Sequence, residues 1–528
     1  MLVRSKYQQL CDYLTLTILL VIVVGIPCSN ILMSLGGIAL AALFLISPKL
    51  VTRAKHVFHE PYAMFALALF AWHIVGLLWT TDIHEGIRDI RIKLPILLFP
   101  IALSGIFMLT EAQKRLVIRI YLLTVLTNTF VLFGIHKNWY GPEVGNFRDL
   151  SLFISHIRLS LNICFAIGLL WLYPNIINTS RISLLIKLAL SFWAIYFLSI
   201  LESGTSMLIA VVTIVAGLLY LLKSKTNPKQ QLIVLSLLIT SIIVSSMLLT
   251  NFYNSIFKAR YSNTKHLAKY SANNKQFTHH NNSQQVENGY FVNQHIIEKE
   301  LTQVWFHRTN TSLKAINKSG YETKANLLRY LTSRGLTKDS IGLSNLSDEE
   351  IKYIQQGATN YRFVNSNGFV KRLYAIMFEW SQYKLGQSPN GHSMIMRFEF
   401  IKAGLHILRE NWLLGVGTGD LHTSFQKAYT ELESKLDVQW RHRAHNQYLS
   451  IWLALGIIGI IIFLGMVFSP IITRKNLPLY TWYFVLIATT SFLTEDTLET
   501  QAGVTFVMFF MSFLYVGGVP RDNNSMLS

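Results

Sequence analysis

The sequence predicts an all-α membrane protein that crosses the bilayer many times. Only 14% of its 528 residues are charged, against roughly 25% in soluble globular proteins. Hydrophobic residues make up 51% of the chain, and many of them fall in uninterrupted apolar runs. Most of these runs approach the ~20 residues that an α-helix needs to cross a hydrocarbon core of ~30 Å. We therefore expect about 12 transmembrane helices.

The expected spans fall into a group of nine and a group of three, separated by a long polar region. The first group covers 13–28, 31–46, 62–79, 94–109, 116–135, 152–172, 184–200, 204–222 and 232–249, and the second covers 447–468, 479–493 and 502–516. Loops rich in Lys and Arg, such as 114–115 and 181–187, alternate with mixed or acidic loops, such as 82–91 and 495–499. Because excess Lys and Arg marks cytoplasmic loops, both termini are expected in the cytoplasm and the long loop outside.

Four segments follow from this layout. Residues 1–250 form a membrane bundle of spans one to nine, and 251–392 form an outer loop or insert. Residues 393–446 form an outer helical segment, and 447–528 hold spans ten to twelve and a tail. The insert is rich in Asn and Gln in places, which leaves a small domain and a partly disordered loop as alternatives.

Charge and cysteine content exclude several other classes. The net charge of +19 suggests nucleic acid, but the basic residues lie in short loops where membrane topology explains them. We therefore predict no nucleic-acid partner. The three cysteines lie in or beside apolar spans, and neither they nor the histidine pairs have the spacing of a metal site. No metal and no other cofactor is predicted.

The outer helical segment leads directly into the tenth span and holds most of the candidate chemistry. Apolar residues recur at helical spacing on both sides of a glycine turn at 415–419. Two amphipathic helices are therefore expected at the membrane face. The turn resembles a phosphate loop, but it lacks the Lys and Ser/Thr of that motif and follows no strand. A tight turn between helices is the simpler interpretation.

His445 is the candidate general base, because histidine titrates near neutral pH and lies here at the outer end of a span. From spacing alone, an interfacial residue that begins the span is the favoured alternative. Four arginines flank it and are suited to bind a phosphate or diphosphate: Arg397, Arg409, Arg441 and Arg443. Each one taken singly also fits a solvated helix face.

Arg158 is the strongest single candidate, because it lies at the outer end of the sixth span or inside it. A charge at membrane depth is costly and usually faces a cavity with a partner. Arg88, just before the fourth span, is a weaker candidate of the same kind. The acidic cluster Glu495, Asp496 and Glu499 is expected either to pair with arginines, to position an acceptor, or to form a plain acidic loop.

These residues resemble the signature region of the O-antigen ligase and O-antigen polymerase superfamily, and most closely its ligases. The signature combines an arginine on a helix (Arg397), the turn N-W-L-L-G-V-G-T-G, the motif H-N-Q-Y-L and two later glycines. The segment I-R-L-S-L-N around Arg158 and the loop and span 493–510 also resemble that superfamily. Within the signature, Gly417 and Asn446 become candidate substrate-binding residues. One departure is Gly204, which stands where the family often has an arginine, and the insert is longer than usual.

The resemblance implies a GT-C-like, metal-independent glycosyltransferase of the bacterial inner membrane. It would move a glycan from undecaprenyl diphosphate to lipid A–core on the periplasmic face, among membrane lipids. His445 would deprotonate the acceptor hydroxyl, Arg158 and Arg397 would stabilise the departing diphosphate, and Arg441 and Arg443 would assist. Displacement in line would invert the anomeric centre.

Two alternatives remain at this point. A repeat-unit polymerase or a protein O-oligosaccharyltransferase would use the same chemistry with another acceptor. A transporter without catalysis is disfavoured, because neither inverted repeats nor paired broken helices are visible in the sequence.

Overall fold

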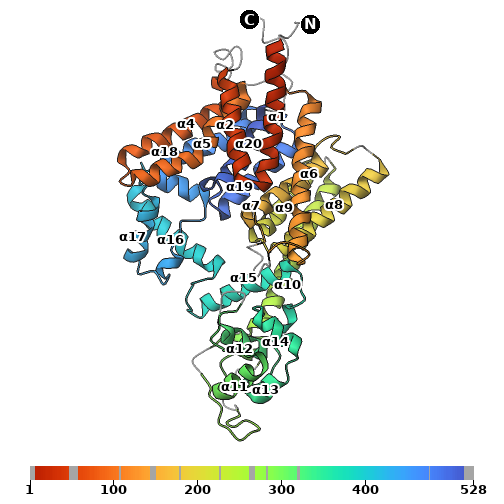
Figure 1. The fold of residues 1–528 in the computed structure, drawn as a ribbon, viewed down its shortest axis with the longest axis vertical. Helices are drawn as coiled ribbons and strands as arrows, with labels where there is room; N and C mark the ends of the chain where they lie inside the picture. Colours follow the sequence, from red (N-terminus) through yellow and green to blue (C-terminus); the bar gives the residue numbers. More distant parts are fainter. Residues whose placement is uncertain are drawn as a thin grey trace. The chain divides into compact units, whose positions relative to one another are not determined.

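The computed structural model describes residues 6–46, 57–105, 109–142, 150–177, 180–224, 227–260, 268–280, 284–317, 322–474 and 476–516. It is almost entirely helical, as the sequence predicts (Figure 1). Two compact units can be separated. The first takes the described parts of Met1–Pro142, Leu150–Thr213 and Met396–Ser528, and the second is built from Ile214–Ile395.

The helices of the first unit are long and mostly apolar. In chain order they are α1 (Lys6–Cys28), α2 (Asn30–Ile46), α4 (Pro61–Val75), the 3-10 helix η1 (Gly76–Trp79), α5 (Ile83–Gly105), α6 (Glu111–His136), α7 (His156–Leu172), α8 (Arg181–Ile200), α9 (Gly204–Ser224, which continues into the second unit), α16 (Ser393–Asn411), α17 (Leu421–Glu431), η4 (Val438–Trp440), α18 (Gln447–Thr473), α19 (Leu479–Thr494), η5 (Thr497–Glu499) and α20 (Gln501–Val516).

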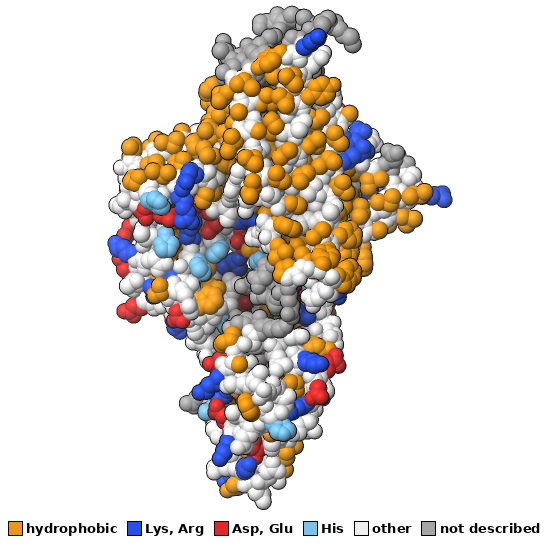
Figure 2. Space-filling model, viewed as in Figure 1, with side chains coloured by type: hydrophobic (Ala, Val, Ile, Leu, Met, Phe, Trp, Pro, Cys, Tyr) orange, Lys and Arg blue, Asp and Glu red, His pale blue; other side chains and the backbone are white. Residues whose placement is uncertain are grey.

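Length and composition identify the chain as a multi-pass membrane protein. Within the part of the chain that the structure describes, seven helical stretches are long and apolar enough to cross a bilayer: Gln9–Cys28, Pro61–Trp79, Glu111–His136, Arg181–Ile200, Gly204–Ser224, Pro228–Phe257 and Gln447–Thr473. Four further apolar helices, α2, α7, α19 and α20, are shorter. Hydrophobic side chains cover most of the surface over the long helices (Figure 2). The total of about 12 spans stays a prediction.

The fourth expected span, 94–109, lies largely in α5, and residues 106–108 are outside the described part of the chain. The helix begins at Ile83, well before the apolar run. Its first turns carry Glu85, Arg88, Asp89 and Lys93, so a polar half-helix precedes the apolar half. This polar half contributes to the functional site described below.

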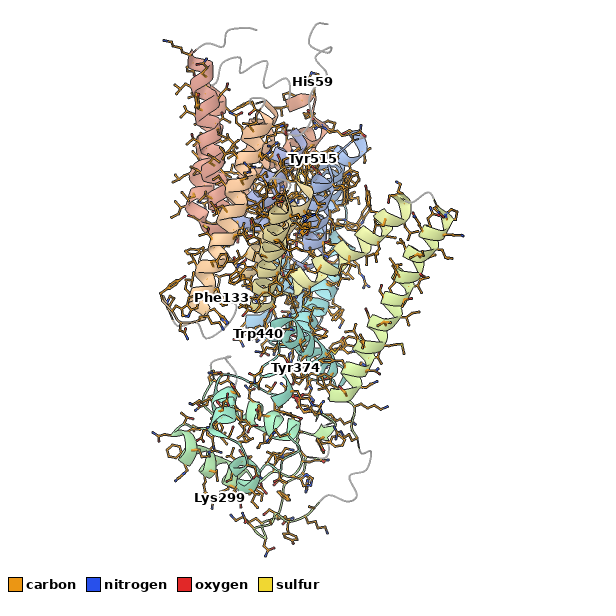
Figure 3. All side chains as sticks on the ribbon, turned by 90° about the vertical axis from the view of Figure 1, so that its right-hand side faces the viewer. His59, Phe133, Lys299, Tyr374, Trp440 and Tyr515 are labelled. Atoms are coloured by element: carbon orange, nitrogen blue, oxygen red, sulfur yellow. The ribbon has the colours of Figure 1, made fainter. Side chains whose placement is uncertain are left out.

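The core of the first unit surrounds α20, in which every described side chain from Gly503 to Tyr515 is buried. Aromatic rings from three helices meet there, with ring centroids 4.8 Å apart for both Phe165–Phe484 and Phe165–Phe510. Figure 3 shows the dense packing of side chains near Tyr515. Because a close-packed interior resists deformation, this core gives the loop before α20 a rigid base.

Helix α18 is broken at Gly456, whose backbone angles (φ 66°, ψ −166°) are essentially restricted to glycine. The break leaves backbone carbonyl groups of α18 without their usual helical partners, and N–H groups of the glycine turn at 415–419 bind them. Val416 N donates to Leu453 O at 2.8 Å, and Gly417 N donates to Ala454 O at 3.0 Å. The turn therefore satisfies backbone groups that a break inside an apolar helix would otherwise leave unpaired.

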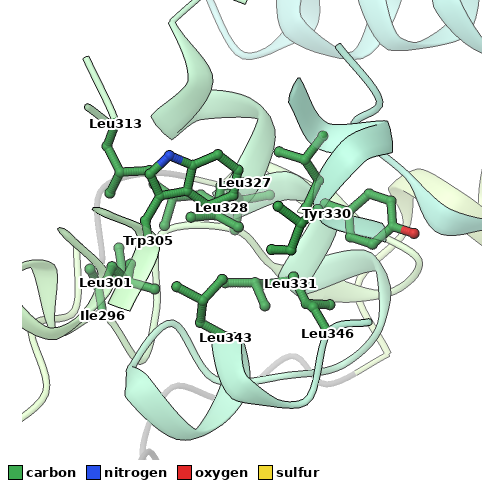
Figure 4. Packing of buried hydrophobic residues seen from close by; sticks show 13 residues of the cluster. Ile296, Leu301, Trp305, Leu313, Leu327, Leu328, Tyr330, Leu331, Leu343 and Leu346 are labelled. Atoms are coloured by element: carbon green, nitrogen blue, oxygen red, sulfur yellow. The ribbon is translucent and has the colours of Figure 1, made fainter. Parts of the chain in front are cut away.

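The second unit begins within α9 and contains α10 (Pro228–Phe257), β1 (Val286–Glu287), β2 (Tyr290–Phe291), α11 (Glu298–Thr309), α12 (Thr323–Ser333), α13 (Ser340–Ser344), α14 (Asp348–Gln355), η3 (Tyr361–Phe363) and α15 (Gly368–Lys384). The two strands pair antiparallel through the turn Asn288-Gly289, where both residues have positive φ. Trp305, Leu327 and Leu331 lie at the centre of a fully buried apolar cluster (Figure 4). The described part of the insert is therefore a folded domain with its own core.

The break in α18 leads to the first prediction. Replacing Gly456 with Ala places a Cβ against the carbonyl oxygen of Leu413 and forces an unfavourable φ. We expect a loss of about 2 kcal/mol or more in stability, measured as a lower thermal midpoint of the purified protein in detergent. Gly37→Ala is the matched control, because a Cβ there meets no atom within 4 Å. Equal midpoints for the two variants would contradict a requirement for glycine at the break.

Lys338 leads to a second prediction, on pH. Its side chain is 3% exposed and donates to Phe291 O, and burial lowers its pKa to about 7. An unfolded lysine keeps its proton up to a pKa near 10.5. Between these values the unfolded state binds the proton and the folded state does not, so the stability of the insert should rise with pH from 7 towards 10.

Hydrogen exchange in peptides from α12, corrected for intrinsic rates, measures this effect in the full-length protein. Lys338→Met should remove the pH dependence and increase protection at pH 7. Lys352→Met, at an exposed position on α14, should leave both unchanged. A Lys338→Met protein that retains the wild-type pH profile would rule Lys338 out as the origin of the effect.

Candidate functional site

A cavity of about 370 Å³, here called the central pocket, opens where several polar chain segments of the first unit meet. Its walls come from the start of α7, the start of α17, the segment before α18 and the loop between α19 and α20. The lining side chains are Ser155, Ile157, Arg158, His422, Arg441, His442, Arg443, His445, Glu495, Asp496, Glu499 and Thr500. Histidine and charged side chains gather on the visible surface over α16 and α17 (Figure 2).

Arg158 is buried at the first turn of α7, whose N-cap is Ser155. Its guanidinium donates to the loop before α20: Nη2 to Asp496 O at 3.1 Å, Nη1 to Thr497 Oγ1 at 3.3 Å and Nε to Thr500 Oγ1 at 3.2 Å. The buried positive charge of Arg158 is therefore stabilised by hydrogen bonds to oxygen atoms and does not lie in an apolar environment. The guanidinium still lines the pocket.

His445 has a left-handed backbone (φ 46°), which costs a non-glycine residue roughly 1–2 kcal/mol. The carboxylate of Asp496 holds this conformation: Oδ2 accepts from His445 N at 3.1 Å, and Oδ1 accepts from Asn446 N at 3.0 Å. The imidazole Nδ1 lies 3.7 Å from Glu495 Oε2. With Nδ1 directed at a carboxylate, Nε2 is the nitrogen that can meet a ligand.

Glu495 connects His445 with Arg397. Arg397 Nη2 donates to Glu495 Oε1 at 2.7 Å, while the other carboxylate oxygen is the one near His445. Burial would raise the pKa of Glu495, but the nearby imidazole of His445 and the charges of Arg397 and Arg158 hold that pKa below its usual value. Glu495 is thus ionised at neutral pH and can orient the imidazole.

A chain of ion pairs leads away from Arg443 and Glu499 in the wall of the central pocket. Arg443 Nη1 lies 3.1 Å from Glu499 Oε2, and the same oxygen lies 2.8 Å from Lys93 Nζ. Lys93 also contacts Asp89 at 2.6 Å, and Gln447 donates to the other oxygen of Glu499. Burial would raise the pKa of Glu499, yet Lys93 and Arg443 lower it. The carboxylate therefore remains charged and fixes Arg443 in place.

The remaining candidates from the sequence lie in different positions. Arg441 lines the central pocket and donates to Leu436 O and Thr430 Oγ1. Arg409 is exposed near the end of α16 and lies outside this cavity. Asn446 is the N-cap of α18, since its Oδ1 accepts from Leu449 N. Gly417 bonds to the broken helix through its backbone.

Arg88 lines a second cavity and pairs with Glu85 at 2.7 Å. This cavity shares Arg443 and His422 with the central pocket.

Sequence reasoning missed several residues of the site. Lys93 stands at the start of an apolar run, where a lysine usually marks the membrane interface; Asp89, four residues earlier, was the available signal. His422 and His442 line the central pocket but have no motif of their own. Burial lowers the pKa of His442, and the charges of His445 and His422 lower it further. His442 is therefore neutral at pH 7.

No group of His, Cys, Asp and Glu side chains within the described ranges is placed to hold a metal ion. The arrangement instead offers a base, oriented by a carboxylate, beside guanidinium groups that carry positive charge into a cavity. Such a site can deprotonate a hydroxyl and stabilise a phosphate leaving group.

Residues 354–464 match a family model described as O-antigen ligase. The matched range includes α16, the glycine turn, α17, the segment with Arg441, Arg443 and His445, and most of α18. No curated protein matches the chain. Residues 354–464 of this multi-pass membrane protein are thus similar to the O-antigen ligase family.

Proposed function

We propose that the protein is an inner-membrane glycosyltransferase that moves a glycan from undecaprenyl diphosphate to lipid A–core on the periplasmic face. The observation that carries this proposal is the central pocket, where His445 and its partner Glu495 stand beside Arg158 and Arg443. The O-antigen ligase match covers His445 and Arg443. A membrane-embedded donor and a polar acceptor both need a cavity of this kind next to apolar helices.

His445 supplies the base in this mechanism. Its Nε2 accepts the proton of the acceptor hydroxyl as the oxygen attacks the anomeric carbon of the donor. The new glycosidic bond forms as the bond to the diphosphate breaks, and the diphosphate leaves with the electron pair. Glu495 keeps Nδ1 protonated and stabilises the imidazolium that results, as a carboxylate partner does in other base-orienter pairs. Attack from the opposite face inverts the anomeric centre.

Arg158 and Arg443 receive the leaving group. Three N–H groups of the Arg158 guanidinium are engaged with the loop before α20, and the remaining ones are available to a phosphate oxygen. Arg441 contributes further positive charge from the pocket wall. Stabilising the charge that develops on a departing diphosphate is the largest contribution expected of such a site. No metal ion is required in this scheme.

In this proposal, Arg397 has a different role from the one that the sequence predicts. Its ion pair with Glu495 places it behind His445, and the central pocket is not lined by it. We therefore assign Arg397 to positioning: it holds Glu495, which in turn orients the imidazole. The matching family model is described as O-antigen ligase. The chemistry of the pocket suits any acceptor hydroxyl, so a polymerase and a protein O-oligosaccharyltransferase are the alternatives.

The base and the leaving-group site are tested by His445→Ala and Arg158→Gln. Each should reduce glycan transfer by about 10²- to 10⁴-fold in a purified or membrane assay, because one loses the base and the other a contact made in the transition state. Arg409→Ala, at an exposed position, should retain near-normal activity. Full transfer by both site variants at normal protein levels would refute the mechanism.

The acceptor is identified by the lipid that accumulates when the gene is deleted. Loss of a ligase leaves full-length polymer on the carrier, whereas loss of a polymerase leaves single repeats on the core. Lipopolysaccharide gels and mass spectrometry of the carrier lipids distinguish these results, and normal profiles of both would argue against either enzyme.

A double-mutant cycle tests the positioning role of Arg397. Arg397→Met and Glu495→Gln should each lower kcat by about 10- to 100-fold, and the double variant should lose no more than the more damaged single variant. This non-additivity is expected when two residues act through one contact. Strictly multiplicative losses would show instead that Arg397 acts on the substrate independently of Glu495.

A further inference from the structure

The second cavity, here called the side pocket, has a volume of about 410 Å³ and adjoins the central pocket. The two cavities share Arg443 and His422, so they are neighbouring compartments of one site. The side pocket is formed between the polar half of α5 and the segment that leads from the glycine turn into α17. Its volume lies in the range typical of small-molecule sites, about 300–1,000 Å³.

The walls of the side pocket are held together by hydrogen bonds. The Asp420 carboxylate, just before α17, accepts from Thr81 N at 2.7 Å and from Asp82 N at 2.8 Å. Asp82 in turn accepts from Glu85 N at 3.0 Å, and Thr418 Oγ1 donates to His73 O at 2.6 Å. The start of α5 is therefore tied to the start of α17, and the cavity is preformed.

The chemistry of the side pocket differs from that of the central pocket. Three carboxylates line it, from Asp82, Glu85 and Asp89, together with the hydroxyl groups of Thr418 and Thr423. Ionised carboxylates only accept hydrogen bonds, so they match the hydroxyl groups of sugars and repel phosphate. Charges of both signs are partly neutralised in this pocket, since Arg88 pairs with Glu85, Lys93 with Asp89 and Arg443 with Glu499.

We propose that the side pocket is a sugar-binding subsite, which holds uncharged, hydroxyl-rich sugar residues next to the bond that is formed. This inference rests on the proposed function, because it takes the central pocket as the place of the diphosphate and of His445. Arg443, which lines both cavities, marks the boundary between the anionic and the sugar parts of the substrates. The sugars belong either to the donor or to the acceptor, and the experiment separates these sources.

The test uses full-length protein in detergent and four lipids, measured by thermophoresis. Undecaprenyl diphosphate is compared with the same carrier bearing a repeat unit, and lipid A is compared with lipid A–core. Glu85→Trp fills the side pocket at a half-buried position, and Glu85→Gln removes only its charge. Glu410→Trp is the matched control, because Glu410 is exposed on α16 and outside both cavities.

Glu85→Trp should weaken binding of one sugar-bearing lipid by about tenfold or more, and Glu85→Gln should weaken it less. The sugar-free counterpart should bind within about twofold of the wild type. If affinity is lost for the carrier with the repeat unit, the sugars in the side pocket belong to the donor. If affinity is lost for lipid A–core, they belong to the acceptor.

The inference is overturned if Glu85→Trp weakens binding of sugar-free undecaprenyl diphosphate as much as binding of the sugar-bearing carrier. It is also overturned if Glu85→Trp binds all four lipids with the same affinities as Glu410→Trp. Two results can also be separated. If the wild-type protein transfers no glycan, but Glu85→Trp still weakens binding of only a sugar-bearing lipid, the proposed enzyme is refuted and the sugar-binding subsite is supported.

Discussion

The loop between α19 and α20 carries three buried carboxylates, and the geometry of the site depends on how their charges are balanced. Glu495 is paired with Arg397 and Glu499 with Lys93 and Arg443, while Asp496 binds the backbone of His445 and Asn446. The partners come from α5, α16 and the segment before α18, and Arg158 of α7 binds the same loop. Removing one partner of a buried ion pair costs roughly 3–5 kcal/mol, because the other charge is left uncompensated. Each of these elements is therefore fixed by the others, and the donors of the site are positioned before any substrate arrives.

The sequence was sufficient to predict the helical membrane class and a costly, partnered charge at Arg158, since both depend on local properties. A membrane span can be recognised from the length of an apolar run alone, and a charge inside such a run is costly wherever the helix lies. The partner of Arg397 could not be predicted in this way, because Glu495 lies 98 residues further along the chain. The motif marked Arg397 as a diphosphate ligand, but the structure gives it a carboxylate instead. Its role thus depends on tertiary contacts that no periodicity reports.

The glycine turn shows a second limit of sequence reasoning. Residues 447–468 read as one unbroken apolar span, so nothing predicted a break at Gly456. Without the break, nothing in the sequence shows that the N–H groups of Val416 and Gly417 bind carbonyl groups of α18. The insert was ambiguous for another reason: α13 and α14 contain only 5 and 8 residues, and helical patterning in such short pieces does not show whether they pack into one core. Its core is assembled from contacts between such short pieces.

The ion pair between Arg443 and Glu499 has a consequence for any anion that enters the central pocket. The phosphate meets a guanidinium that already has a carboxylate partner, so binding exchanges one pairing for another. The free energy gained is only the difference between the two, and Glu499 acts as a competitor built into the chain. The same carboxylate can recover its partner when the anion departs. In the proposed reaction, such a site would bind the diphosphate carrier less tightly but release the spent diphosphate more readily.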